Sequence, residues 1–182
     1  MLRARSSPEC HLYMDLNPCR CGEVEFEPQH WLEQVSDQLV ATYQGPCPGC
    51  GTERTFRFEL DPEPPPPPPA YGGDKPSGLI DPGQFLWVAE QLAASVPIDP
   101  TEITDPEERA DAIESLETAV AALEEVLKFV PAGADAVPEE AFTAPEGWMV
   151  YHEEPGRFRR DRLRAVLSTY RDMHTRHAQA AG

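Results

Sequence analysis

Two short stretches near the start of the chain carry most of the structural information in the sequence: NPCRCGEVEF, residues 17–26, and GPCPGCGTERTFRF, residues 45–58. In each, proline precedes the first cysteine of a pair and glycine follows the second. Together they hold four of the five cysteines in the chain. An odd cysteine count without an export signal argues against a disulfide framework, so we expect reduced thiols or a bound metal.

The four paired cysteines, Cys19, Cys21, Cys47 and Cys50, are the ligand type that tetrahedral zinc prefers. Thiolate sulfur binds Zn²⁺ at about 2.3 Å, and cysteines at tight turns leave backbone amides free to stabilise the thiolates. Proline fixes the approach to such a turn, and glycine permits unusual backbone angles after the last ligand. Four protein ligands leave no open coordination position, so the sequence predicts a structural Zn²⁺.

The two motifs resemble those of zinc-ribbon domains, in particular bacterial ones with two cysteine-knuckle hairpins. The resemblance covers residues 11–60 and implies that the four paired cysteines are the metal ligands. The first pair departs from the usual pattern, because one residue separates its cysteines, and this leaves room for Cys10 or His11 as a ligand. Buried unliganded cysteines and a redox pair are the alternatives, but CPGC lacks the strand and helix context of a thiol oxidoreductase.

The segments beside the cysteine pairs have the residue pattern of β-strands. HLYMDL (11–16) and EVEFE (23–27) alternate apolar and polar residues, while LVATY (39–43) and RTFRFEL (54–60) are rich in β-formers. We therefore expect two hairpins, each turning at a cysteine pair. Between them, PQHWLEQVSDQL (28–39) places apolar residues at helical spacing, so a short helix competes there with a loop.

After the proline-rich residues 61–80 the apolar period becomes helical. Asp81 before Pro82 predicts a helix start, a second helix is expected from Pro106 to Pro131, and a third begins near Pro155. Packing of their apolar stripes predicts a small helical bundle. The sequence thus predicts an α+β chain with a zinc-ribbon-like domain (1–60), a proline-rich linker (61–80) and a helical domain (81–182).

The formal net charge of −17 is unevenly distributed: −4 over residues 1–60, −18 over residues 61–154 and +5 over residues 155–182. An acidic body of this kind repels nucleic acid and anionic membranes and attracts basic proteins. The basic end can contact nucleic acid or an acidic partner, or it can pair internally with the acidic segment, and the charge distribution favours internal pairing. The candidate contact residues are Arg157, Arg159, Arg160, Arg162 and Arg164.

No metalloprotease, phosphate-binding, nucleophile-elbow or dinucleotide-binding motif occurs in the sequence. His174 and His177 share a helix face, but no thiol or carboxylate ligand for a shared metal is evident near them in the sequence, so we expect them to flank the helix end. Catalytic groups can converge from distant positions, so an enzyme is not excluded, but the sequence favours a non-catalytic protein without catalytic residues.

These features predict a soluble, cytoplasmic, acidic protein, and the use of Arg, Ala, Pro and Glu with only two lysines is typical of a GC-rich bacterial genome. We expect a zinc-binding protein-interaction protein, such as an immunity protein that neutralises a basic toxin by covering the groove where the toxin binds nucleic acid. The alternative is a zinc-ribbon nucleic-acid-binding or transcription-associated accessory protein that uses its arginine-rich C-terminal helix.

Overall fold

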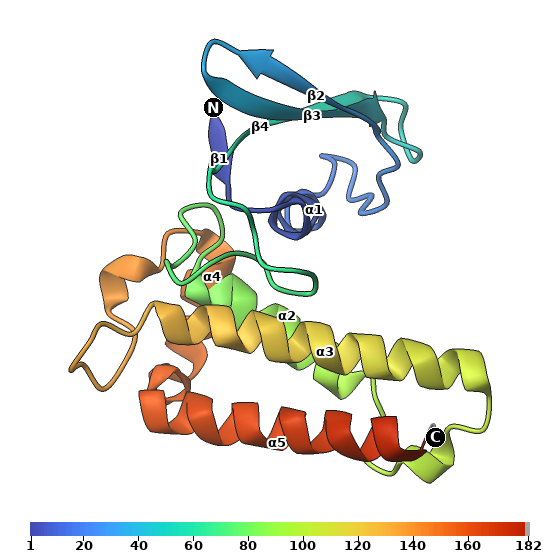
Figure 1. The fold of residues 1–182 in the computed structure, drawn as a ribbon, viewed down its shortest axis with the longest axis vertical. Helices are drawn as coiled ribbons and strands as arrows, with labels where there is room; N and C mark the ends of the chain where they lie inside the picture. Colours follow the sequence, from blue (N-terminus) through green and yellow to red (C-terminus); the bar gives the residue numbers. More distant parts are fainter. Residues whose placement is uncertain (181–182) are drawn as a thin grey trace. The chain divides into compact units, whose positions relative to one another are not determined.

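A computed structural model describes residues 1–180 and shows an α+β chain (Figure 1). The chain divides into two compact units. The first, called the sheet unit, comprises Met1–Gly73 and Ser77–Leu79, and the second, called the helical unit, comprises Asp74–Pro76 and Ile80–Gly182. Within the described residues, no helix combines the length and the apolar character needed to cross a membrane.

The sheet unit is built from one four-stranded sheet and one helix, α1 (Ser7–Asp15), which lies across one face of the sheet (Figure 1). The hairpin between the last two strands turns at the second cysteine pair, as the sequence predicted. The strands β1 (Leu2–Ala4), β2 (Gln29–Val35), β3 (Gln38–Pro46) and β4 (Glu53–Leu60) lie in the order β1-β4-β3-β2, with β1 parallel to β4 and the other pairs antiparallel.

The prediction of a strand on each side of the first cysteine pair is wrong. Residues 23–27 form no strand, and residues 11–15 belong to α1, so the first pair lies in a loop and not at a hairpin turn. The side chain of Ser6 caps α1 by accepting a hydrogen bond from the Glu9 amide (3.1 Å). Cys10 and Met14, four residues apart, then form the buried helix face, which is a helical and not a strand spacing.

For the segment 28–39 the sequence left a short helix and a loop as alternatives, and the structure contains neither. It forms β2 and the start of β3, joined by a turn in which Ser36 has a φ of +57°. Pairing of β2 along β3 outweighs the local helical spacing of its apolar residues, because strand stability comes mainly from cross-strand partners.

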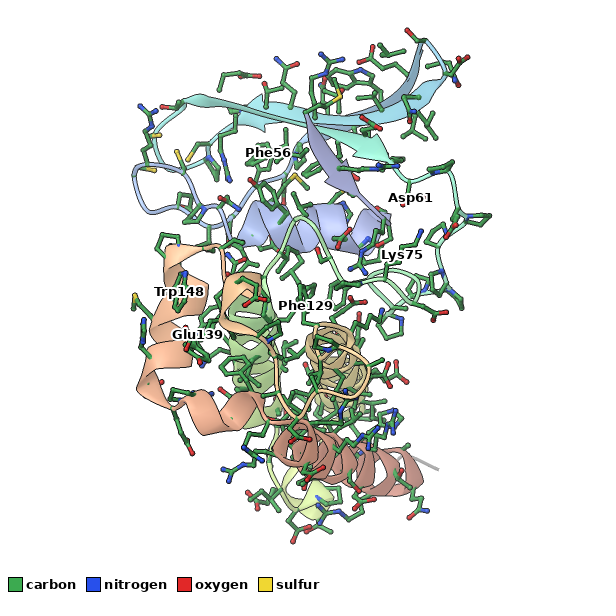
Figure 2. The ribbon with its side chains drawn as sticks, turned by 90° about the vertical axis from the view of Figure 1, so that its left-hand side faces the viewer. Phe56, Asp61, Lys75, Phe129, Glu139 and Trp148 are labelled. Carbon is green, nitrogen blue, oxygen red and sulfur yellow. The ribbon has the colours of Figure 1, made fainter. Side chains whose placement is uncertain are left out.

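The core of the sheet unit is largely aromatic. Figure 2 shows Phe56 between the sheet and α1, where its ring meets Tyr13 edge-on at 6.3 Å. Phe58 is fully buried and contacts the ring of Tyr13 at 5.7 Å and that of Tyr43 at 5.9 Å, both edge-on. Such edge-to-face pairs add specific geometry to the burial of apolar area.

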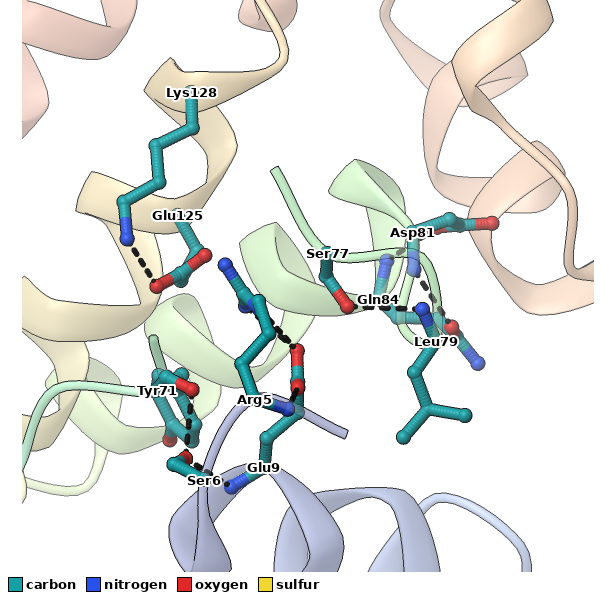
Figure 3. Close-up of polar contacts among 10 residues, drawn as sticks. All are labelled: Arg5, Ser6, Glu9, Tyr71, Ser77, Leu79, Asp81, Gln84, Glu125 and Lys128. Atoms are coloured by element: carbon teal, nitrogen blue, oxygen red, sulfur yellow. Dashed lines mark hydrogen bonds and ion pairs between the residues drawn. The ribbon is translucent and has the colours of Figure 1, made fainter. Parts of the chain in front are cut away.

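Polar contacts hold residues beyond β4 to the sheet unit. In Figure 3, Ser6 Oγ donates a hydrogen bond to the backbone carbonyl of Tyr71 (2.6 Å), so one hydroxyl caps α1 and fixes a residue of the predicted linker. The fully buried Glu9 accepts from the Arg5 amide (2.6 Å) and from its guanidinium (2.6 Å and 2.9 Å). This pair satisfies a carboxylate that would otherwise be costly to bury.

Two of the three helix starts that the prolines predicted are confirmed, those of α2 at Pro82 and α3 at Pro106. The third is wrong: Pro155–Phe158 forms a separate 3-10 turn, and α5 begins only at Arg160. Asp81 caps α2, and Gln84 returns a hydrogen bond to the Asp81 amide, which completes a capping box (Figure 3). The helices α3 and α5 lie side by side (Figure 1), and Met173 of α5 packs against Ala112 and Leu116 of α3. The α-helices in the described part of this unit are α2 (Pro82–Ala94), α3 (Pro106–Lys128), α4 (Pro145–Glu153) and α5 (Arg160–Ala180).

Candidate metal centre

The four paired cysteines converge in the sheet unit although they come from two separate loops. The Sγ atoms of Cys19 and Cys50 are 3.6 Å apart, as are those of Cys21 and Cys47. All four Sγ atoms lie within 4.8 Å of one another, so this four-cysteine cluster is able to hold a metal ion.

The sulfur spacing fits a tetrahedral metal better than disulfides. Sulfurs placed 2.3 Å from a metal at the corners of a tetrahedron are about 3.8 Å apart. The two measured separations of 3.6 Å are close to that value and well beyond the roughly 2.05 Å of a disulfide bond. The cysteines are accordingly free thiols in a pre-arranged ligand set.

The second cysteine loop, between β3 and β4, is closed by two backbone hydrogen bonds. The Gly51 amide donates to the Cys47 carbonyl (2.8 Å), and the Cys47 amide donates to the Thr52 carbonyl (2.8 Å). Gly51 has a φ of +72°, a conformation that residues with a Cβ rarely adopt. The glycine after the second cysteine is therefore required by the shape of the loop.

The first cysteine loop has the same closure with one residue fewer. The Gly22 amide donates to the Cys19 carbonyl (2.8 Å), the Cys19 amide donates to the Glu23 carbonyl (2.9 Å), and Gly22 has a φ of +91°. In both loops the glycine amide bonds the first cysteine, and the first cysteine bonds the residue after the glycine. The shorter spacing of the first pair thus changes the length of the turn and leaves its hydrogen-bonding scheme intact.

The thiols differ in acidity and exposure. The side chain and amide of Thr52 hydrogen-bond Cys50 and lower the pKa of that exposed thiol to about 6. At Cys21 the Glu23 amide acts to lower the pKa, but the neighbouring Cys50 and Cys47 thiols outweigh it and raise the pKa to about 12. A bound metal takes thiolates, so it displaces the protons from all four cysteines.

The two alternative ligands lie outside the cluster. Cys10 is fully buried in the core between α1 and the sheet, where burial raises the pKa of its thiol to about 12. His11 lies one residue further along α1 and contacts the ring of Tyr43 edge-on at 5.4 Å. Within residues 1–180 the candidate metal cluster contains neither residue.

The arginines predicted as contact residues fall into two groups. Arg157 forms ion pairs with Glu90 and Glu153, and Arg160 donates to the carbonyls of Ala134 (3.0 Å) and Pro131 (2.7 Å). The other three are exposed, and the structure of residues 1–180 records no side-chain hydrogen bond or ion pair for them: Arg159, Arg162 and Arg164.

The two histidines of α5 have separate roles. His174 Nε2 lies 3.1 Å from a carboxylate oxygen of Glu117 on α3, so its partner is distant in the sequence. His177 is fully buried, and its Nε2 lies 2.9 Å from the Pro97 carbonyl. These contacts anchor α5 to the rest of the helical unit.

A second group of polar residues, which sequence reasoning missed, lines a groove between α1 and the start of β2. Ser7, His11 and Asp15 stand at intervals of four along the helix, and His30 faces them from the strand side. The four-residue interval was the available signal, but it is visible only once this segment is recognised as a helix.

No family model, curated protein or solved structure matches this chain. The likeness to zinc ribbons stays a prediction, and the function is inferred from the geometry and chemistry of the chain itself.

Proposed function

We propose that the four-cysteine cluster holds a structural Zn²⁺ and that the protein acts by binding a basic protein partner. The metal assignment is supported by four soft ligands at tetrahedral spacing. Because four protein sulfurs fill the coordination sphere, the site has no position for water or substrate. Structural zinc contributes roughly 10–16 kcal/mol of apparent binding free energy in small domains. Metal binding can therefore stabilise the two cysteine loops, which have no regular secondary structure of their own.

One observation carries the binding proposal: an unpaired acidic stripe on α3. Glu107, Asp111 and Glu114 are exposed at intervals of four and three residues, so they share one helix face. No ion pair is recorded for any of them in the described part of the chain. We call these three residues the acidic stripe.

The basic C-terminal residues support the same proposal because two of them are neutralised inside the helical unit. Arg157 pairs with Glu90 of α2, and Arg171 of α5 pairs with Glu124 of α3 (2.6 Å). These ion pairs neutralise arginine charge within the helical unit, whereas no ion pair neutralises the acidic stripe in the described residues. A chain of net charge −17 then attracts a basic partner at long range and repels nucleic acid.

The basic partner that fits this charge is a nucleic-acid-binding protein, such as a toxin that attacks nucleic acid. Its substrate groove is lined with cations, and an acidic helix face can occupy that groove in place of phosphates. In this function the protein is a non-catalytic inhibitor of the immunity type.

The test is capture of partners from the native host by the zinc-loaded chain, followed by elution with salt and identification. We expect the wild-type chain to capture a basic protein. The variant in which Glu107, Asp111 and Glu114 are all changed to lysine should no longer capture it. The matched control changes three scattered exposed acids to lysine, Asp37, Glu63 and Glu146, and alters the net charge equally. Capture that survives in the stripe variant, or that fails equally in both variants, would contradict the proposal.

A second candidate function follows from the exposed Arg159, Arg162 and Arg164, whose side chains have no recorded partner within residues 1–180 and are available for phosphate contacts. This function is nucleic-acid binding in an accessory role. It predicts salt-sensitive binding of labelled DNA or RNA at low ionic strength. Changing Arg162 and Arg164 to glutamate should reduce the affinity of this binding. Absence of binding at 20 to 50 mM salt, roughly the range where phosphate contacts are strongest, would eliminate it.

A further inference from the structure

The groove between α1 and β2 lies wholly within the sheet unit and is separate from the four-cysteine cluster. It has a volume of about 360 Å³. One wall is the face of α1 that carries Ser7, His11 and Asp15, and the other is formed by alternate residues of an extended segment, Phe26, Pro28 and His30. Its size lies at the lower end of the range for pockets that take small ligands or single side chains.

The floor of the groove is a buried aromatic ring. The ring of Tyr43, only 2% exposed, stacks on His30 (centroids 4.5 Å apart, planes 18° apart) and meets His11 edge-on. The side chains of Ser7 and Cys10 act on the pKa of the Tyr43 hydroxyl and so lie beside it. Both imidazoles are therefore held against one fixed ring, one on each wall of the groove.

Three polar side chains of the groove have hydrogen-bonding capacity to spare. No side-chain hydrogen bond is recorded for His11, Asp15 or His30 in the structure of residues 1–180, and all three are exposed. A carboxylate offers only acceptors, and each neutral imidazole offers one acceptor and one donor. The groove is therefore richer in acceptors than in donors, which selects a ligand that is rich in N–H groups.

The charge of the surroundings selects a cation over a neutral donor. Asp15 is the acid of the groove, and residues 1–60 carry a net charge of −4. Arg54 acts electrostatically on Asp15, but its guanidinium lies over the ring of Phe26 at 4.3 Å and donates to the carbonyls of Asn17 (2.6 Å) and Met14 (3.5 Å). This contact shows that the Phe26 ring can stack on a guanidinium.

We propose that this groove binds a guanidinium group, supplied by an arginine side chain of the protein partner. A planar guanidinium presents five N–H donors, matches a carboxylate such as Asp15 in a forked geometry, and stacks on aromatic rings. The source of the arginine rests on the proposed function, since a basic partner is what supplies exposed arginines. The chemistry of the groove does not depend on it.

The experiment titrates the ¹⁵N-labelled, zinc-loaded full chain with N-acetyl-arginine-N-methylamide and follows the amide signals of His11, Asp15 and His30. We expect saturable shifts with a Kd of about 1 mM, the affinity typical of so small a ligand. The neutral isostere N-acetyl-citrulline-N-methylamide keeps the shape and loses the charge, so we expect binding at least about tenfold weaker.

Two variants separate the carboxylate from general charge. Asp15→Asn keeps the size of the side chain and should weaken binding of the arginine probe about tenfold, since it removes a charged acceptor. Asp37→Asn makes the same charge change in the exposed turn after β2 and should leave the affinity unchanged. Equal binding of the citrulline probe, equal affinity in Asp15→Asn, or no saturable shift would each overturn the proposal.

Free L-arginine distinguishes the two sources of the group. If it binds more tightly than the amide-capped probe, the groove serves a small molecule, and the assignment to a protein arginine is wrong. Partner capture through the acidic stripe is a separate measurement. Loss of capture with intact arginine binding counts against the proposed function, and intact capture without arginine binding counts against the groove alone.

Discussion

Gly83 of α2 lies directly against the backbone of Gly147 in α4. A Cβ atom added at Gly83 would be 2.5 Å from the Gly147 Cα, closer than real Cβ contacts allow, and one added at Gly147 would collide with the Asp81 carboxylate. The first turns of two helices therefore touch through their backbones. Only a pair of glycines permits this approach, and it places α4 where Asp81 can reach it.

We predict that Gly83→Ala destabilises the helical unit by about 2–3 kcal/mol, because the backbone of α4 must move to admit the methyl group. The sign of this change in unfolding free energy is what tests the backbone contact. Alanine in place of a helical glycine normally stabilises by about 0.5–1 kcal/mol. Urea unfolding of the purified variant measures the difference.

The matched control for the glycine contact is Gly156→Ala. Gly156 has no atom within 4 Å of an added Cβ and has no positive φ. We expect a change in unfolding free energy within about 0.5 kcal/mol, as for an ordinary surface substitution. If the two glycine variants lost equal stability, close backbone packing would not be the cause.

The carboxylate of Asp81 caps α2 and also binds the segment that leads into α4. Its Oδ1 accepts from the Gly83 and Gln84 amides of α2 (2.9 Å and 3.0 Å), and its Oδ2 accepts from the Thr143 and Ala144 amides at the start of α4 (3.0 Å and 2.7 Å). Asp81→Ala leaves four amides without this partner, so we predict a loss of about 3–4 kcal/mol, against about 1 kcal/mol for a single cap.

The comparison for Asp81 is Asp105→Ala, at the exposed start of α3. Asp105 accepts from only two amides, those of Glu107 (2.8 Å) and Glu108 (3.2 Å). Its replacement should cost about 1 kcal/mol, the usual value for an N-cap. Equal losses of stability in the two variants would show that the bonds to Thr143 and Ala144 contribute nothing.

Metal content gives the direct test of the four-cysteine cluster. We expect about one zinc per chain by elemental analysis, and a strong chelator should lower the thermal midpoint of the sheet unit. Cys47→Ser removes a buried ligand and should abolish stoichiometric zinc, whereas Cys10→Ala should keep it, since Cys10 lies outside the cluster. A wild-type chain that is folded, metal-free and indifferent to chelator would refute the assignment.

The cluster was predictable because its turns are determined locally. Proline before the first cysteine and glycine after the second restrict the loop regardless of the rest of the fold, and Gly22 and Gly51 show the positive φ that this requires. The helix starts at Asp81 and Asp105 were predictable for the same reason, since capping needs only residues a few positions apart.

The errors occurred where a local pattern had two interpretations. Leu12 and Met14 alternate like strand residues, but Ser6, Pro8 and Glu9 form a helix-start signature that should have taken priority. The groove was invisible because its two walls come from α1 and from residues 26–30, and only the pairing of β2 with β3 brings them together. Such long-range pairing has no local signal.

The buried thiol of Cys10 makes the stability of the sheet unit depend on alkaline pH. Burial raises its pKa from 9.0 to about 12, so between these values the unfolded chain loses a proton that the folded chain keeps, and stability falls as pH rises. The stability difference between wild type and Cys10→Ala should therefore shrink from pH 8 to pH 10 in urea unfolding of the zinc-loaded proteins. Burial also raises the pKa of Tyr43, which should leave a residual slope in the variant at higher pH. A difference that stays constant over this range would show that the Cys10 thiol ionises equally in the folded and unfolded chains.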